Sequence, residues 1–261
     1  MALLRIDHSS MSVKVNLPLN LILPSPSSLK GKTLADFRVL YLLHGLSDDA
    51  SAWQRYTNIE ILARELNLAV IMPTGGRSMY TDMSNGQAYF RYLTEELPEY
   101  LQKVFQLNLK RENTAIAGLS MGGYGAFKAA LLRPELYSSA GSLSGVLGLQ
   151  FLPTIEDVNL HQEFSQLFGD LAHAMGSADD PLIWLENAAK NPTAYPRLYA
   201  SCGRQDELLP INQIFNQRAL SLGFPLTYVE EDGIHDWHFW QDQIAYFLKH
   251  FMPAPTQTSA K

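Results

Sequence analysis

Short apolar runs that alternate with segments of helical periodicity fill most of the chain beyond residue 39. The runs at 39–43 and 68–72 are continuously apolar, as expected for strands buried on both faces. Strands that alternate with helices need crossover connections, which build a mostly parallel sheet with helices on both faces. The predicted strands are 39–43, 68–72, 113–117, 137–143, 197–202 and 226–230, and the predicted helices are 59–66, 93–105, 121–132, 211–222 and 237–251.

The alternation fails at the start of the chain and in one internal segment. A candidate strand at 3–6 and the apolar residues Val13, Val15 and Leu17, continued at 19–23, predict antiparallel β structure before a Pro- and Ser-rich loop at 24–30. Residues 148–191 hold short helical patterns and no convincing strand, which predicts a small helical insertion. This insertion either partly covers the functional site or packs on the edge of the sheet. We therefore expect one α/β domain over 1–252 and a flexible tail at 253–261.

Charge and composition exclude several classes of function. The net charge is −6 and no run of Lys and Arg forms a phosphate-binding footprint, so we expect no nucleic-acid partner. No apolar run is long enough to cross a bilayer, and the first residues lack the pattern of a signal peptide. A single cysteine permits no intrachain disulfide. These features predict a cytoplasmic protein without a membrane partner.

The segment 118–122, Gly-Leu-Ser-Met-Gly, matches the nucleophile elbow of serine hydrolases. That motif needs a sharp strand-to-helix turn with glycines where side chains would collide, and it raises the serine oxygen above the sheet. The apolar segment 114–117 precedes the motif, and the small-residue-rich segment 122–130 continues from its last glycine, as this context requires. Ser120 is thus the predicted nucleophile. Cys202 is a rival, but it lies inside a predicted strand, where cysteine is usually inert.

The catalytic base of such a fold lies late in the chain, on a loop after the last strand. His235 follows the predicted strand at 226–230 and precedes the final helix. His238 falls inside that helix, while His161 and His250 are interpreted as structural. A metal pair of His235 and His238 has no further clustered ligands, so we predict no metal site.

The acid that orients the histidine should follow the preceding strand, and Asp206 stands just after the strand at 197–202. Glu207 is its main rival. Asp232 and Asp236 lie so close in sequence to the histidine that they are poorly placed to orient its ring. Asp206 is also a favoured residue for a helix N-terminal cap, and that role is compatible with catalysis.

Acyl transfer also needs two donors aimed at the oxyanion. One is the backbone N–H after the nucleophile, at Met121, and the other comes from the loop after an early strand. The apolar strand at 39–43 ends in His44-Gly45, so the N–H of Leu46 is the predicted second donor. We expect His44 to brace this loop rather than to transfer protons.

Together these motifs resemble the esterase D family of the α/β-hydrolase superfamily, and among its branches the bacterial tributyrin esterases. S-formylglutathione hydrolases are similar but carry a longer loop after the strand that here ends at 72–76, and mycolyl transferases are similar in fold but exported. The matching segments are 41–45, 58–60, 69–73, 80–82, 95–98, 117–125, 202–203 with Asp206, and 235–237.

The resemblance implies a serine carboxylesterase for short acyl groups, acetyl to butyryl, with no cofactor and often a homo-oligomer such as a dimer or tetramer. It implies that Trp53, Tyr80 and Trp237 line the substrate pocket, the alternative being that they fill the core. Acetylated sugars, tributyrin-like glycerides and aryl esters all stay open as substrates. A thioesterase or acyltransferase on the same scaffold is the alternative activity. A binding module without catalytic activity is the alternative from outside the class of enzymes.

Overall fold

The computed structural model describes residues 1–25, 29 and 31–253. Most of the predicted loop at 24–30 and of the predicted tail at 253–261 lies outside these residues. Within the described residues, eight strands form one sheet. They are β1 Ala2–Ser9, β2 Asn16–Leu23, β3 Arg38–Leu43, β4 Leu68–Pro73, β5 Thr114–Leu119, β6 Ser139–Leu143, β7 Arg197–Gly203 and β8 Leu226–Glu231.

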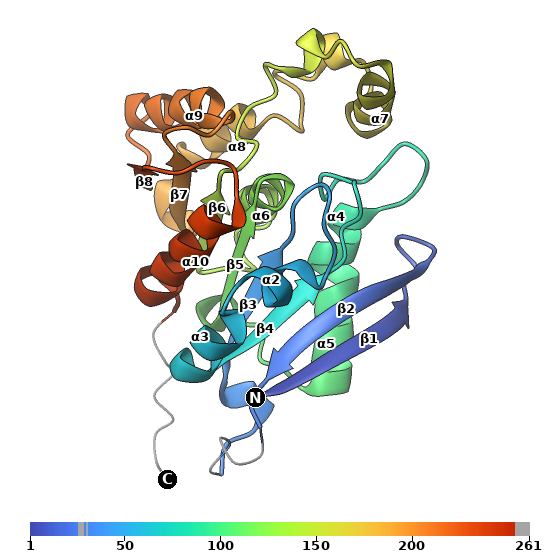
Figure 1. Ribbon diagram of the computed structural model, residues 1–261, viewed down its shortest axis with the longest axis vertical. Helices are drawn as coiled ribbons and strands as arrows, with labels where there is room; N and C mark the ends of the chain where they lie inside the picture. The colour runs from blue at the N-terminus through green and yellow to red at the C-terminus, as the bar shows by residue number, and fades with distance from the viewer. Residues whose placement is uncertain (26–28, 30, 254–261) are drawn as a thin grey trace.

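The strand order in space is β1-β2-β4-β3-β5-β6-β7-β8. The pairs β1–β2 and β2–β4 are antiparallel, and every later pair is parallel. All the strands from β3 onward therefore end at the same edge of the sheet, and β5 stands near its centre (Figure 1). This edge collects the loops in which the sequence predicts the chemistry. The sheet confirms the predicted α/β class.

The helices connect successive parallel strands. The α- and π-helical segments are α2 Ala52–Tyr56, α3 Ile59–Leu66, α4 Tyr89–Arg91, the π-helical turn η2 Tyr92–Glu96, α5 Leu97–Phe105, α6 Met121–Leu132, α7 Val158–Phe168, α8 Pro181–Ala188, α9 Leu209–Ser221 and α10 Trp237–Phe251. Short 3₁₀ turns lie at η1 Leu34–Asp36, η3 Arg111–Asn113, η4 Leu152–Thr154, η5 Leu171–His173 and η6 Pro192–Ala194.

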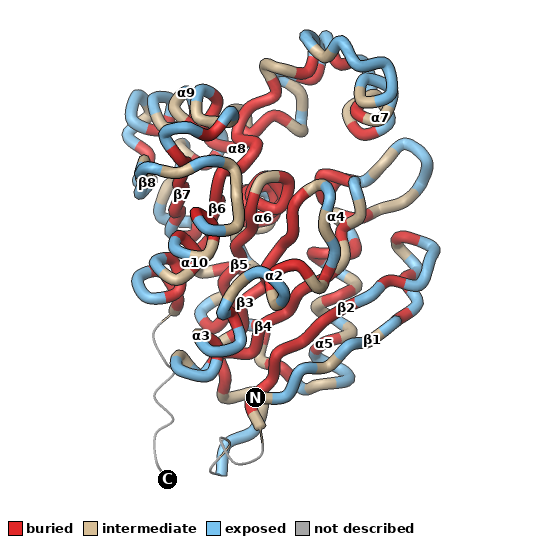
Figure 2. Tube along the Cα trace, viewed as in Figure 1, coloured by how far each residue is buried: buried red, intermediate tan, exposed pale blue. Residues whose placement is uncertain are grey.

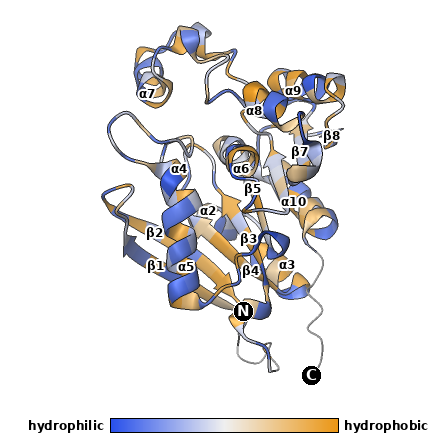
Figure 3. Cartoon of the chain, turned by 180° about the vertical axis from the view of Figure 1, so that it is seen from behind, coloured by the Kyte–Doolittle hydropathy of each residue, from blue (hydrophilic) through white to orange (hydrophobic). Residues whose placement is uncertain are grey.

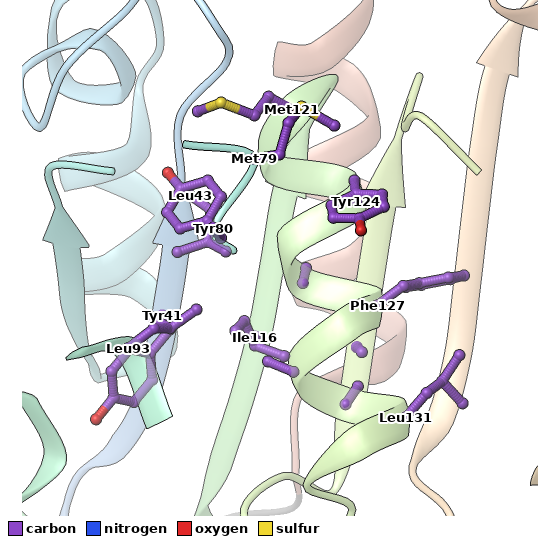
Figure 4. Packing of buried hydrophobic residues seen from close by; sticks show 14 of the residues in the cluster. Tyr41, Leu43, Met79, Tyr80, Leu93, Ile116, Met121, Tyr124, Phe127 and Leu131 are labelled. Carbon is purple, nitrogen blue, oxygen red and sulfur yellow. The ribbon is translucent and has the colours of Figure 1, made fainter. Parts of the chain in front are cut away.

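Two hydrophobic cores cover the two faces of the sheet. Along β3, Tyr41 and Leu43 belong to the core under α5 and α6, whereas Leu40 and Leu42 belong to the core under α3 and α10. This alternation is the period of a strand, and it explains why a strand between two helix layers is apolar throughout. Figure 2 shows the central strands buried along their length, and Figure 4 shows α6 packing on the sheet. In Figure 3, α5 turns a hydrophilic face outward from the apolar strands.

The first hairpin differs from the sequence prediction at its turn. Val13 and Val15 belong to the turn between β1 and β2, since Ser10 N–H donates to Val15 O at 3.0 Å. Lys14 takes a positive φ of 65° within this turn. Val13 is nevertheless fully buried, so its apolar character reflects contact with the core rather than strand pairing.

Residues 148–191 contain no strand among the described residues and hold η4, α7, η5 and α8. The segment is tied to the rest of the chain by polar contacts. Arg77 forms two hydrogen bonds with Glu163 of α7, at 2.5 and 2.8 Å. Ser84 donates to the backbone carbonyl of Gln166. In Figure 1 α7 projects above the sheet edge at which the strands end.

No helix in the described part of the chain combines the length and the apolar character needed to cross a membrane.

Candidate active site

Ser120 occupies a sharp turn between β5 and α6. Its φ of 50° and ψ of −118° place a non-glycine residue in a strained region of backbone space. Such strain persists only where the surrounding structure enforces it, and it is concentrated at functional sites. The turn directs the chain from the centre of the sheet straight into a helix, as the elbow motif predicts.

The glycines of the motif are required by space. A Cβ atom on Gly122 would stand 2.5 Å from the carbonyl oxygen of Leu43, and one on Gly118 would stand 2.3 Å from the carbonyl oxygen of Gly122. Both contacts are far shorter than van der Waals distance and involve backbone atoms that cannot move aside. The predicted collision is therefore present on both sides of Ser120.

His235 and Asp206 are joined by hydrogen bonds at the same edge of the sheet. The ring Nδ1 of His235 lies 2.9 and 3.0 Å from the two carboxylate oxygens of Asp206. Asp206 follows β7 and its side chain is fully buried, whereas the His235 side chain, after β8, is 25% exposed. Burial alone would raise the pKa of Asp206, but hydrogen bonds that include those from His235 and the Leu208 N–H hold its pKa below the ordinary value.

Ser120 and His235 line one cleft of about 370 Å³. Among the described residues no hydrogen bond joins the Ser120 hydroxyl to the imidazole, while the Nδ1 side of that imidazole is already held by Asp206. In serine hydrolases the contact between nucleophile and base is often long until substrate binds. Ser120 and His235 share this cleft, and Asp206 is joined to it through His235, although 86 residues separate Ser120 from Asp206 and 29 separate Asp206 from His235 along the chain.

The rival residues have other positions. Glu207 is exposed, and Asp232 pairs with Arg204 on the surface. Asp236 lines the cleft, but its side chain caps α10 by accepting the Phe239 N–H at 3.0 Å. Burial raises the pKa of the Cys202 thiol, which disfavours its thiolate.

The other histidines do not line the cleft. His161, His238 and His250 are all exposed. No group of three or more His, Cys, Asp or Glu side chains in the described part of the chain is arranged to hold a metal ion.

The two predicted oxyanion donors come from the loop after β3 and from the start of α6. Leu46 lines the cleft, and Met121 is the first residue of α6, where a helix leaves its N–H groups without intrahelical partners. Among the described residues neither the Leu46 N–H nor the Met121 N–H has a protein acceptor. Backbone donors left unpaired beside a nucleophile suit a developing oxyanion.

His44 is buried and holds the loop that carries Leu46. Its Nε2 accepts the Gly75 N–H at 2.8 Å, so the proton is on Nδ1, which lies 2.7 Å from the carbonyl oxygen of Gly45. Burial lowers the pKa of His44 to about 4, which keeps the ring neutral near pH 7. These two contacts of the His44 ring agree with the bracing role expected from the sequence.

Of the three aromatic residues expected at the pocket, Trp237 lines the cleft. Trp53 is buried, and its indole N–H donates to the Leu43 carbonyl at 2.9 Å. Tyr80 is buried as well, and its hydroxyl accepts the His44 N–H at 3.1 Å. Trp53 and Tyr80 are thus buried side chains whose polar groups bind the backbone, and neither is among the residues that line the cleft.

Trp240 and Asp48 are among the cleft residues that the sequence did not predict. Trp240 lies one helical turn after Trp237. Its ring packs edge-to-face against the His235 ring, with 4.9 Å between the ring centres. This spacing of i and i+3 on α10 was the available signal. Asp48 also lines the cleft and carried no motif of its own.

Comparisons with known proteins agree with this arrangement. The family model described as "Putative esterase" matches residues 10–251. The acetyl esterase of Caldicellulosiruptor saccharolyticus is 31% identical over 255 residues, covering 94% of this chain and 96% of that protein. The substrate-bound structure of the fluorophosphonate-binding serine hydrolase FphF of Staphylococcus aureus is 32% identical, with a TM-score of 0.88 over 97% of this chain and 99% of that one. The S-formylglutathione hydrolase FrmB of the same organism is 32% identical, with a TM-score of 0.85 over 96% and 98% of the two chains.

The fold and the relatives define a serine hydrolase of the α/β-hydrolase class. More particularly, the chain belongs to the esterase family whose model it matches. This agrees with the family resemblance in the sequence and removes the alternative of a non-catalytic binding module.

Proposed function

We propose that Ser120, His235 and Asp206 form a catalytic triad that hydrolyses carboxylic esters with short acyl groups, acetyl to butyryl. The observation that carries the proposal is the pair of hydrogen bonds between His235 and Asp206 in a cleft that Ser120 also lines. The name of the acetyl esterase relative supports a short acyl group. Acetylated sugars, tributyrin-like glycerides and aryl esters all fall within this class.

The proposed reaction runs through an acyl-enzyme. The Ser120 oxygen attacks the ester carbonyl as His235 takes the hydroxyl proton, and the N–H groups of Leu46 and Met121 stabilise the oxyanion. The imidazolium then donates that proton to the leaving alcohol as the carbonyl–oxygen bond breaks. Water, activated by His235, releases the acid and regenerates Ser120. Asp206 holds the imidazole in the required tautomer throughout. The proposed reaction uses no cofactor.

Replacement of Ser120 by Ala tests this proposal. Hydrolysis of 4-nitrophenyl acetate by the variant should fall by about three orders of magnitude or more, because the residual rate comes from the oxyanion donors alone. A folded variant that keeps full activity would refute the assignment.

A thioesterase or acyltransferase activity is the second candidate, supported by the similarity to the S-formylglutathione hydrolase FrmB. The triad does not separate these reactions, since water, alcohols and thiols compete for one acyl-enzyme. Products formed from 4-nitrophenyl acetate with an added alcohol, and turnover of a thioester, distinguish them. Acyl transfer above hydrolysis would favour a transferase, and a higher kcat/KM for the thioester would favour a thioesterase.

Two further predictions concern the assembly and its location. We propose a homo-oligomer, a dimer or tetramer, whose mass is measured by light scattering. We also propose a cytoplasmic location, which cell fractionation tests.

A further inference from the structure

A second hollow adjoins the active-site cleft. It measures about 190 Å³ and shares Ser47 and Asp48 with the cleft, so these two residues form a common border. Beyond this border the second hollow is lined mainly by polar side chains, those of Asp49, Ser51, Arg55 and Tyr56.

Aromatic side chains of α2 and α10 connect the second hollow to the part of the cleft that holds His235. His235 must reach the leaving oxygen to protonate it, so the alcohol part of an ester extends past His235. Helix α10 begins two residues after His235, and the ring of Trp237 lies 4.9 Å from that of Tyr56 on α2. Both helices cover the same face of the sheet (Figure 1). Trp237, which lines the cleft with His235, therefore also contacts Tyr56 of the second hollow.

The charged groups of this hollow differ in how many hydrogen bonds they already make within the protein. Asp49 accepts two hydrogen bonds from Ser51, at 2.6 and 2.7 Å, and is committed to its own loop. Asp48 is half-buried between the two hollows; burial raises the pKa of its carboxyl group and the backbone of Gly45 offsets only part of that effect. A ligand that donates hydrogen bonds to Asp48 would stabilise its charged form.

Besides hydroxyl groups, the hollow holds a carboxylate acceptor at Asp48, a guanidinium donor at Arg55 and an aromatic wall at Tyr56. The guanidinium of Arg55 lies 5.5 Å from the centre of the Tyr56 ring, and Tyr56 is 50% exposed. A hydroxyl-bearing carbon chain suits this combination, because its hydroxyls both donate to Asp48 and accept from Arg55 while its CH groups pack on the rings. A purely alkyl alcohol would leave both charged groups desolvated without partners. An anionic alcohol would be repelled by Asp48 and Asp49.

We propose that the second hollow is the binding site for the leaving alcohol, that this alcohol is a neutral polyol or sugar, and that Asp48 determines the specificity for it. The inference rests on the proposed esterase function. In the reaction Ser120 takes the acyl group, the bond from the acyl carbon to the polyol oxygen breaks, and that oxygen leaves with the proton from His235. Water then completes the hydrolysis.

The test compares two acetyl esters that differ in the alcohol, 6-O-acetylglucose and ethyl acetate. The measured quantity is the ratio of their kcat/KM values in the wild type, Asp48→Ala, Arg55→Ala and the control Glu65→Ala. Glu65 is an exposed carboxylate on α3 that lines neither hollow. The wild-type ratio should favour the sugar ester, and each of the two hollow variants should lower it at least about tenfold through the loss of hydrogen bonds to the hydroxyls. The control should leave the ratio unchanged.

A ratio that stays the same in both hollow variants would overturn the proposal, as would a wild-type ratio that favours ethyl acetate. Arg55 is exposed, so its variant keeps the test valid if Asp48→Ala fails to fold. The esterase function fails in a different way, with turnover of neither ester. Competitive inhibition of 4-nitrophenyl acetate hydrolysis by free glucose in the wild type, and weaker inhibition in Arg55→Ala, is expected as well; equal inhibition in both would count against the site.

Discussion

The Nε2 atom of His44 accepts a hydrogen bond from the backbone N–H of Gly75 at 2.8 Å. This contact fixes the proton on Nδ1, which then donates to the carbonyl oxygen of Gly45 at 2.7 Å. No peptide bond in the described residues is cis. In the trans peptide between Gly45 and Leu46 the N–H points opposite to the carbonyl. By holding the carbonyl, His44 therefore directs the Leu46 N–H away from itself, as an oxyanion donor requires.

Removal of the His44 ring should impair catalysis rather than binding. In His44→Ala we expect kcat for 4-nitrophenyl acetate to fall about tenfold to a hundredfold, since one oxyanion donor loses its fixed direction. KM should change little. Because an Asn amide nitrogen can occupy the position of Nδ1, His44→Asn should lose less activity than His44→Ala. An unchanged kcat in folded His44→Ala would contradict the bracing role.

The same residue should contribute to acid sensitivity. The pKa of His44 is about 4 in the folded chain, against an ordinary value of 6.5. Between these values the unfolded chain binds the proton and the folded chain does not, so the free energy of unfolding decreases as pH falls from about 6.5 towards 4. From pH 7.5 to 4.5 this residue should account for a loss of about 2 to 3 kcal/mol. Urea unfolding of the wild type and of His44→Asn measures it, and an equal pH dependence in both would exclude the effect.

Asp206→Asn should remove most of the activity without unfolding the chain. An amide at this position can donate to Nδ1 and so hold the imidazole in the wrong tautomer, which costs about 10⁴-fold in kcat in the general case of such triads. The matched control is Glu207→Gln, which changes the adjacent, exposed carboxylate. Its kcat should stay within about threefold of the wild type, given its exposure. If the Glu207 variant loses more activity than the Asp206 variant, the acid is misassigned.

A buried ion pair should tie the segment before α8 to the nucleophile helix. Lys128 of α6 is 5% exposed and its Nζ lies 2.6 Å from the Asp179 carboxylate. Burial lowers the pKa of Lys128, while Asp179 opposes that effect. Asp179→Ala leaves a buried charge unpaired and should lower the free energy of unfolding by about 3 kcal/mol.

A double-mutant cycle completes that test. Lys128→Met with Asp179→Ala should be less destabilised than Asp179→Ala alone, because no uncompensated charge remains. Additive losses in urea unfolding would show that the two residues are not coupled.

The sequence was sufficient to predict the sheet and the position of the nucleophile because each has a local cause. Continuous apolar runs mark strands covered on both faces, and the two glycines flanking Ser120 mark a turn at which any Cβ would collide with backbone. The order of Ser120, Asp206 and His235 follows from where the strands end. The hydrogen bonds of His235 to Asp206 agree with that reasoning.

Other features depend on contacts that local patterns do not encode. Val13 is apolar because the turn places it against the core, although it lies outside both strands of the hairpin. The family resemblance implies that Trp53 and Tyr80 line the pocket, but both are buried and their polar atoms bind the backbone of Leu43 and His44. Asp48 lines both hollows because the tertiary fold places them side by side, and no spacing along the sequence predicts this position.

The central claim is that Ser120 carries the acyl group during turnover. Its most direct test is to mix the enzyme with 4-nitrophenyl acetate, quench in acid within the first turnover, and locate the acetyl group by peptide mass spectrometry. We predict one acetyl group on the peptide that contains Ser120, and none on that peptide in Ser120→Ala. An acetyl group on a different residue in the wild type, or rapid ester hydrolysis by the variant, would contradict the account.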